Sequence, residues 1–373
     1  MKIKDKVASW FISNIMIPKM EEMDKPGFII TRVSSRENIY LRDIFISESL
    51  ISELERLCKE KLKYKGEKAL YSTGKKFVFY YSKNSEFTKA EEKGFSDFAY
   101  FFVRYIEGTY AKRIDHKIDM NKKLLKLNAD KYIVCSKNGL GYIFSEGSIA
   151  GIWSYAFQDY TIEAVQTKCQ GRGDKGCEII CAPAKALKKM NLKFLEERNL
   201  SELDFEDSYK EMNKVRKTTY AENSLEDLIN SGFLKYSHGI VNYNYERFFL
   251  CETSFIYILE KELRKLKGAD KILFDVSFNW GKMLAQKERK QDFGKFIMDF
   301  MSALGWGDIL VLKERGKYKV IIDYFPWTKF ASDINFIMFR GMISGILSTD
   351  RKVMLRKIEK DTSQGYLSLW LSE

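Results

Sequence analysis

Apolar and polar positions alternate most clearly on the two sides of a glycine-rich turn in the middle of the chain. Residues 161–168 alternate β-branched and polar side chains, and residues 178–181 form a second short apolar run. Both patterns are typical of strands. The two runs therefore predict a β-hairpin, with Cys169 and Cys177 at its two feet.

A comparison of the chain with itself indicates an internal duplication. Residues 147–154 read Gly-Ser-Ile-Ala-Gly-Ile-Trp-Ser, and residues 341–348 read Gly-Met-Ile-Ser-Gly-Ile-Leu-Ser. In each copy this predicted helix precedes a strand, a turn and a final strand, at 161–181 in the first copy and 352–371 in the second. The pattern predicts the α+β class, with two tandem repeats of a helix-plus-antiparallel-sheet domain.

The repeats set the predicted domain boundaries. We expect an N-terminal extension over residues 1–40, a first domain over 41–183, a charged helical connector over 184–240, and a second domain over 241–373. Apolar stripes at helical spacing predict a helix near the start of each domain. These two helices are predicted to end near Gly66 and Gly268.

Composition and charge narrow the classes of function. The 373 residues are 45 % hydrophobic, and 63 Lys and Arg against 51 Asp and Glu give a formal charge of +12. Such a charge permits binding to nucleic acid, but basic and acidic residues are interspersed and no DNA-binding motif accompanies them. No segment approaches the roughly twenty continuous apolar residues of a transmembrane helix. We expect a soluble, cytoplasmic protein, and six scattered thiols do not indicate a secreted disulfide scaffold.

The hairpin cysteines are the first candidate site. Facing residues of an antiparallel pair have Cβ atoms about 4.5–5.5 Å apart, close enough to share a metal ion or to form a disulfide. Three alternatives stay open for Cys169 and Cys177: a metal site, a disulfide or redox pair, and two unbridged thiols. Cys181 cannot share one ion with Cys177, because four residues along a strand span about 13 Å.

Aromatic residues on the helix before the hairpin form the second candidate site. Trp153, Tyr155 and Phe157 follow Gly151 closely. They are either ordinary core residues or the lining of a pocket for a flat apolar ligand. Gly147 and Gly151 share one helix face, which predicts close packing of a second backbone there.

Residues 147–183 resemble the 4-vinyl reductase domain family. They contain a helix, a strand that ends at Cys169, a Gly-Asp turn, and Cys177 at the family's spacing. The family includes a protein linked to bacteriochlorophyll vinyl reduction, sensor domains of aromatic-responsive transcription activators, and archaeal proteins; small subunits of the TRAPP tethering complex share its fold. The resemblance implies an α+β domain that encloses a hydrophobic cavity and pairs with a like domain, here as a pseudo-dimer within the chain.

In the sensor branch of that family, zinc is held by the two hairpin cysteines, an upstream cysteine and a glutamate three positions before the first hairpin cysteine. This chain departs from the pattern at two positions. Gln166 stands at the glutamate position, and the upstream position falls near Tyr142 or Ile143. Neutral glutamine is a poor zinc ligand, whereas structural zinc takes four good ones.

If a metal binds at this hairpin, the predicted cofactor is zinc, held by a ligand set that differs from the family's. Cys135 lies on a separate predicted strand and is the expected third thiolate beside Cys169 and Cys177. Glu163 or Glu178 is a more distant fourth ligand. The equivalent hairpin of the second repeat has no cysteine, so the fold is expected to close this hairpin without one.

The sequence favours a non-catalytic, regulatory protein that binds or senses a hydrophobic small molecule. No catalytic residues are predicted, because His116 and His238 lie in no recognisable catalytic spacing. Two alternatives remain. The first is a reductase that acts on a vinyl-bearing tetrapyrrole, as the family name suggests, and the second is an interaction subunit that binds protein or nucleic acid.

Overall fold

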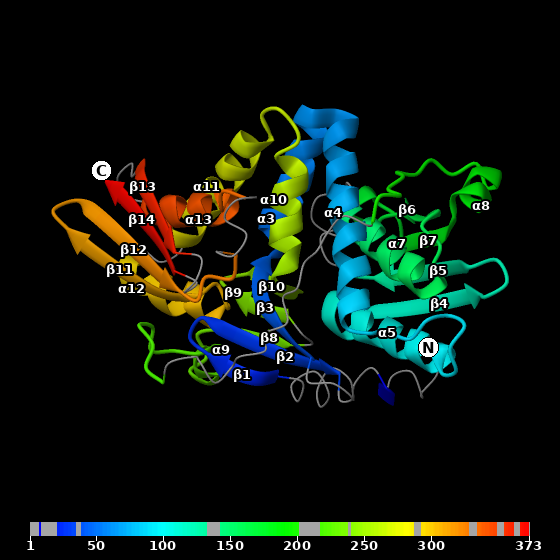
Figure 1. Cartoon of the computed structure of the whole chain (residues 1–373), viewed down its shortest axis with the longest axis horizontal. Coiled ribbons are helices and arrows are strands. Elements are labelled where there is room, and N and C mark those ends of the chain that lie inside the picture. Colours follow the sequence, from blue (N-terminus) through cyan, green and yellow to red (C-terminus); the bar gives the residue numbers. More distant parts are fainter. Residues whose placement is uncertain are drawn as a thin grey trace. The chain divides into compact units, whose positions relative to one another are not determined.

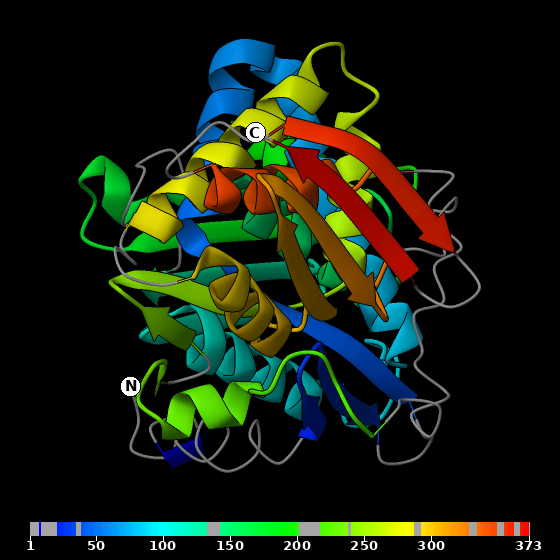
Figure 2. The same ribbon diagram turned by 90° about the vertical axis from the view of Figure 1, so that its left-hand side faces the viewer.

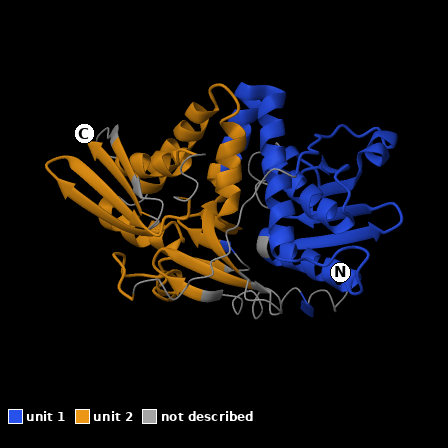
Figure 3. Ribbon diagram, viewed as in Figure 1, with its two compact units in different colours: residues 1–19, 51–206, 238–240 blue, residues 20–50, 207–237, 241–373 orange. Residues whose placement is uncertain are grey.

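The computed structural model divides the chain into two compact units, which are shown in different colours in Figure 3. Unit 1 comprises Met1–Lys19, Ile51–Glu206 and His238–Ile240, and unit 2 comprises Met20–Leu50, Asp207–Ser237 and Val241–Glu373. The structure describes residues 7–8, 21–34, 39–132, 142–200, 217–237, 240–286, 292–327, 334–348, 354–361 and 366–372. Among the helices in these ranges, none is both long and apolar enough to cross a bilayer.

Unit 1 consists of a helical part followed by a sheet (Figure 1). Its elements are α3 (Glu48–Leu57, which begins in unit 2), the π-helix η2 (Cys58–Leu62), α4 (Lys63–Asn84), α5 (Phe95–Tyr110), β4 (Arg113–Asp119), β5 (Leu124–Asp130), α7 (Ile143–Phe157), β6 (Ile162–Lys168), the 3₁₀ turn η3 (Gln170–Arg172), β7 (Cys177–Pro183) and α8 (Ala184–Lys189).

Unit 2 has the same kinds of element and an additional N-terminal group of strands. They are β1 (Glu21–Lys25), β2 (Phe28–Ser34), β3 (Ile39–Ser47), α9 (Leu225–Asn230), β8 (Lys235–Ser237), β9 (Ile240–Tyr243), β10 (Glu246–Glu252), α10 (Ser254–Leu263), α11 (Ala269–Gln286), α12 (Phe293–Phe296), the π-helix η5 (Ile297–Met301), β11 (Asp308–Glu314), β12 (Lys317–Asp323), α13 (Ile337–Leu347), β13 (Met354–Asp361) and β14 (Tyr366–Ser372).

The sheet of unit 1 is antiparallel, with the strand order β4-β5-β7-β6. Alternate residues of β5, including Leu125 and Leu127, are buried, as expected for a strand with one face on the core. α7 packs on β6 and β7. The α+β class is thereby confirmed, and so are the predicted helix over 147–157 and the hairpin that follows it.

The second sheet, in unit 2, has the order β11-β12-β14-β13. In Figure 2 these strands run in front of α13, from orange to red. β13 and β14 match the strands predicted over 352–371. Both four-stranded sheets thus consist of two hairpins. In each sheet the fourth strand along the chain occupies an inner position, and the third strand lies at the edge.

A third sheet, also in unit 2, joins distant parts of the sequence in the order β1-β2-β3-β10-β9-β8. β3 and β10 pair antiparallel at its centre, with Phe45 opposite Leu250. Arg247 forms an ion pair with the buried carboxylate of Glu48 directly after β3. This pairing groups residues 20–50 with the second half of the chain in unit 2.

The structure corrects two local expectations. The helix predicted to end near Gly66 ends at Leu62, where Lys63 takes a positive φ of 54°, and α4 then runs through Gly66. The predicted helical connector contains only the six-residue helices α8 and α9 within its described part, since residues 190–200 form neither helix nor strand. The glutamates there form ion pairs other than i,i+4 pairs along a helix: Glu196 with Lys188 and Arg198, and Glu197 with Lys76 of α4.

Glycines set the spacing of the main helix pair in unit 1. A Cβ built on Gly147 would lie 2.2 Å from the carbonyl oxygen of Tyr71, and one on Gly151 would lie 2.3 Å from that of Lys75. The obstructing atoms are backbone atoms of α4, which cannot move aside as a side chain can. The predicted close packing at these glycines is confirmed.

The corresponding helix pair of unit 2 uses the same device. A Cβ on Gly345 of α13 would lie 2.1 Å from the carbonyl oxygen of Phe278, and one on Gly281 of α11 would lie 2.3 Å from that of Met342. Both pairs of helices therefore cross at backbone contact.

We expect Gly147→Ala to destabilise unit 1. The usual gain of helix propensity from Gly to Ala, about 1 kcal/mol, is outweighed by forced separation of α4 and α7, and overpacking typically costs about 1–3 kcal/mol. Urea unfolding of the full chain measures the change, and Ser148→Ala on the same helix is the control. Equal midpoints for wild type and Gly147→Ala would show that the helices separate without strain.

Candidate functional site

The predicted cysteine hairpin is formed by β6, β7 and the turn between them. Cys169 and Cys177 are 0 % and 2 % exposed. The Cys169 amide donates to Asp174 Oδ2 (2.8 Å), and Gly173 has a φ of +96°, a conformation that favours glycine. Neither cysteine belongs to a disulfide. The turn thus closes through its own hydrogen bonds and a glycine, without a crosslink.

The described residues around the two thiols supply only part of the predicted zinc ligand set. Gln166 Oε1 accepts a hydrogen bond from the Tyr142 amide (3.1 Å), so the carboxamide is engaged by the backbone. No three His, Cys, Asp or Glu side chains in the described ranges are grouped to hold a metal ion, whereas structural zinc takes four ligands. Cys135 lies outside those ranges, and its role with Cys169 and Cys177 stays a prediction.

The two glutamates predicted as a distant fourth ligand have other partners. Glu178 accepts a hydrogen bond from Thr167 Oγ1 (2.7 Å) and forms an ion pair with Lys126 (2.6 Å). Glu163 forms a buried ion pair with Lys75 (2.8 Å). Both carboxylates therefore contribute to packing of the sheet and helices.

Two carboxyl groups that the sequence reasoning missed lie at the start of α7. The residue before the helix is Tyr142, which makes no side-chain cap. Glu55 of α3 replaces the cap, since its Oε1 accepts from the Ile143 amide (2.8 Å). Glu146 accepts from the Gln166 amide (2.6 Å) and ties the first turn of α7 to β6. The only signal in the sequence is a glutamate on the apolar stripe of α3.

Burial governs the protonation of both groups. It raises the pKa of Glu55 well above its usual range, and the Ile143 amide opposes this only in part. Its other oxygen, Oε2, has no hydrogen-bond partner in the described part of the chain, which favours the neutral acid. Burial also raises the pKa of Glu146 to about 7, against the opposing effects of the Gln166 amide and Arg172.

The raised pKa of Glu146 predicts that the stability of the fold depends on pH. The folded chain keeps the Glu146 proton up to about pH 7, whereas the unfolded chain loses it near 4.5. The folded state therefore binds more protons in this window, and stability falls as pH rises through it. Glu146→Gln keeps the acceptor for Gln166 and removes the titration, so we expect it to lose less unfolding free energy than wild type from about pH 5 to 8.

Urea unfolding at a series of pH values provides the measurement. Glu91→Gln, at an exposed position in the same unit, is the control and should retain the wild-type slope. Parallel curves for wild type and Glu146→Gln would contradict the assignment.

The three predicted pocket residues point to two sides of α7. The rings of Trp153 and Phe157 are 5.2 Å apart, and Phe95 of α5 lies 5.8 and 5.9 Å from them, respectively. Tyr155 contacts Phe79 of α4 instead, at 6.0 Å. The structure thus brings Trp153 and Phe157 together, whereas the Tyr155 hydroxyl donates to the carbonyl oxygen of Phe87 (3.0 Å).

Rings of α5 and of the turn after α4 extend the Trp153 side. Phe98 lies 6.2 Å from Phe95 and stacks on Phe102 at 6.2 Å and 24°. Phe87 contacts Phe98 at 5.0 Å. We call this connected set the aromatic cluster: Phe87, Phe95, Phe98, Phe102, Trp153 and Phe157. Its inner members, Phe95 and Trp153, are buried, whereas the other four are only partly buried.

A buried ion pair between α4 and β6 was also missed from the sequence. Lys75 Nζ lies 2.8 Å from Glu163 Oε2, and neither side chain is exposed. The ammonium also donates to the carbonyls of Ile162 (2.7 Å) and Glu197 (2.6 Å). Glu163 accepts from Tyr71 Oη (2.7 Å) and from the Glu197 amide (3.0 Å). Burial lowers the pKa of Lys75 and raises that of Glu163, and their mutual attraction opposes both shifts.

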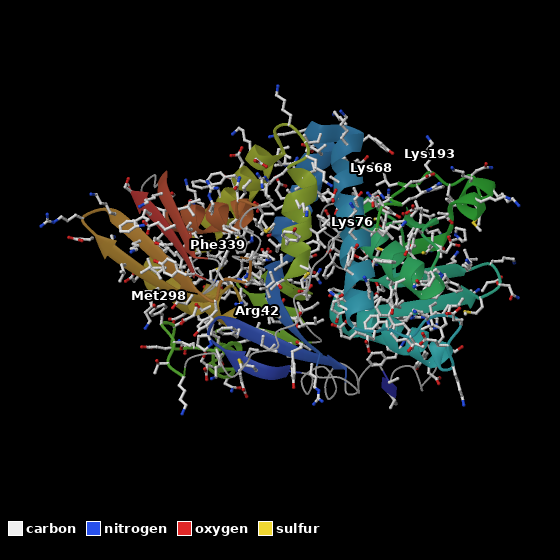
Figure 4. All side chains as sticks on the ribbon, in the orientation of Figure 1. Arg42, Lys68, Lys76, Lys193, Met298 and Phe339 are labelled. Carbon is white, nitrogen blue, oxygen red and sulfur yellow. The ribbon has the colours of Figure 1, made fainter. Side chains whose placement is uncertain are left out.

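Removal of one partner should be costly. Lys75→Met leaves a buried carboxyl group without its counter-ion, and such changes cost about 3–5 kcal/mol. We expect the double variant Lys75→Met/Glu163→Met to recover part of that loss in urea unfolding. Lys68→Met, at an exposed position of the same helix labelled in Figure 4, is the control. A single variant as stable as the control would refute the structural role of the pair.

No protein-family model and no curated protein matches this chain. Among solved structures, it is similar to the crystal structure of the phenol-responsive sensory domain of the transcription activator PoxR with phenol. The TM-score is 0.36 and the sequence identity 13 %, over 50 % of this chain and 92 % of that domain. At this level of similarity, the function has to be argued from the residues of unit 1.

Proposed function

We propose that unit 1 is a non-catalytic binding domain of the 4-vinyl reductase type, and that it senses a flat apolar small molecule docked on the aromatic cluster. The observation that carries this proposal is the gradient of burial within the cluster. Its rings run in continuous contact from buried Trp153 and Phe95 to the partly exposed Phe98, Phe102 and Phe87.

The physical gain comes from covering these rings. Removal of apolar surface from water yields about 25 cal/mol per Å². Offset or tilted contacts between aromatic rings add about 0.5–1.5 kcal/mol each. Phe side chains lose little conformational freedom on binding because they have only two side-chain torsions, and here their neighbours already restrict them. A flat ligand therefore fits the outer rings better than a polar or branched one.

Sensing requires a connection from the ligand to another part of the domain, and α7 is suited to that role. Trp153 and Phe157 lie near its C-terminal end. Its first turn is bonded to Glu55 of α3 and, through Glu146, to β6 of the cysteine hairpin. A shift of α7 on ligand binding would therefore be transmitted to the hairpin.

We further propose that the two units are copies of one domain. The proposal is supported by the equal order of strands in their four-stranded sheets and by helix pairs that both cross at glycines. In this view unit 2 is a like domain without the cysteine hairpin.

The proposal is tested with 2-naphthol as a probe in isothermal titration calorimetry of the full chain. We expect saturable binding at one site, and Phe98→Ala should weaken it about tenfold, equivalent to about 1.4 kcal/mol. Trp153→Phe, which keeps a ring but changes its size, should weaken it less.

A matched control exists in unit 2. Phe274 and Phe278 are also partly buried and stack at 6.0 Å and 24°, nearly as Phe98 and Phe102 do. Phe274→Ala should leave the affinity unchanged. An equal loss in both variants, or no saturable binding of the probe, would sink the proposal.

A further inference from the structure

A groove of about 770 Å³ opens on unit 1 beside α8, and it shares no residue with the aromatic cluster. Four of its lining side chains are cationic: Lys185, Lys188, Lys189 and Arg198. The others are neutral, and no carboxylate is among the residues that line the groove. This volume falls within the range of about 300–1,000 Å³ found for small-molecule sites.

The cations are only partly neutralised. Glu196 forms ion pairs with Lys188 (3.1 Å) and Arg198 (3.0 Å). Lys185 and Lys189 are exposed and make no ion pair with any residue in the described ranges. The four lining cations and the one carboxylate that forms ion pairs with them carry a net charge of three, while the nearby Asp159 is paired with Lys123.

The floor of the groove is held from below by the buried ion pair. Lys75 Nζ donates to the carbonyls of Tyr160 (3.3 Å) and Ile162 (2.7 Å), the two neighbours of the lining residue Thr161. It also donates to the carbonyl of Glu197, the residue before Arg198. A single buried ammonium group thereby fixes two walls of the groove relative to each other.

The start of α8, which forms the third wall of the groove, is bonded to Thr161 at the floor. The Ala184 amide donates to the Thr161 carbonyl (2.8 Å), which connects the start of α8 to the start of β6. Pro183 and Ala184 supply an apolar surface, and the ammonium of Lys188 lies 5.9 Å from the ring centre of Phe194. The groove thus combines a fixed, partly apolar floor with exposed cationic side chains at its rim.

We infer that this groove binds an organic polyphosphate of nucleotide size. Lysine ammonium groups bind phosphate oxygens as point charges, and arginine adds bidentate hydrogen bonds. The excess of three charges matches the several negative charges of a polyphosphate, whereas a monocarboxylate would leave most of them unbalanced. The apolar floor accommodates the organic part. The site is independent of the proposed apolar ligand.

The test uses calorimetry of the full chain with metal-free ATP, sodium tripolyphosphate and adenosine, at about 100 mM salt, where the screening length is about 10 Å. We expect ATP and tripolyphosphate to bind at one site, ATP more tightly, and adenosine not to bind. Lys185→Ala/Lys189→Ala should weaken ATP binding at least about tenfold. Thr161→Glu, which places a carboxylate in the groove, should do the same.

The control variant is Lys61→Ala/Lys65→Ala, which removes the same charge from exposed positions on η2 and α4 of the same unit. It should retain wild-type affinity, and thermal unfolding should show that all variants fold. An equal loss in the control would reveal general charge attraction and overturn the inference. So would an absence of ATP binding, or displacement of ATP by a duplex DNA that binds the same groove more tightly.

Discussion

The buried pair of Lys75 and Glu163 is the interaction on which the arrangement of unit 1 depends. It lies where α4, the start of β6 and the segment after α8 converge. α4 contributes the side chain of Lys75, and the other two contribute backbone groups of Ile162 and Glu197. A hydrophobic pair could fill the same space with less desolvation cost. It could not satisfy the carbonyls of Ile162 and Glu197, because those oxygens require a donor. The ammonium group of Lys75 therefore has a role that an apolar side chain cannot replace: it positions the backbone of β6 and of the segment after α8.

The parts of the fold that the sequence predicted are those dictated by local pattern. The hairpin around Cys169 and Cys177 and the helix over 147–157 follow from strand alternation, turn glycines and apolar content. The Gly-x-x-x-Gly spacing at 147–151 and 341–345 also predicted close packing of these two helices. The break at Lys63 was not predictable, because a positive φ is uncommon at lysine and has no local sequence signal.

The residues of the candidate sites were harder to predict from the sequence, because the burial of a charged group depends on how the whole chain folds. The sequence carries no sign that Lys75 is buried, and for Glu55 its place on an apolar stripe is the only one. Trp153 and Phe157 contact each other, whereas Tyr155 contacts Phe79, since residues two apart on a helix face different directions. The assignment of Cys135 as a ligand lies outside the described residues and stays a prediction.

The central strand pair of the six-stranded sheet constrains the order in which the chain can fold during synthesis. β3 is made early, yet its partner β10 is about two hundred residues further along, as the pairing of Phe45 with Leu250 shows. Until the ribosome has delivered β10, the apolar edge around Ile44 and Ile46 lacks its partner strand, and unpaired apolar edges invite aggregation. Unit 1, whose strands and helices all come from residues in between, can complete its fold first. The nascent chain thus carries one edge of β3 unpaired for much of its translation, although β2 can already pair with the other edge.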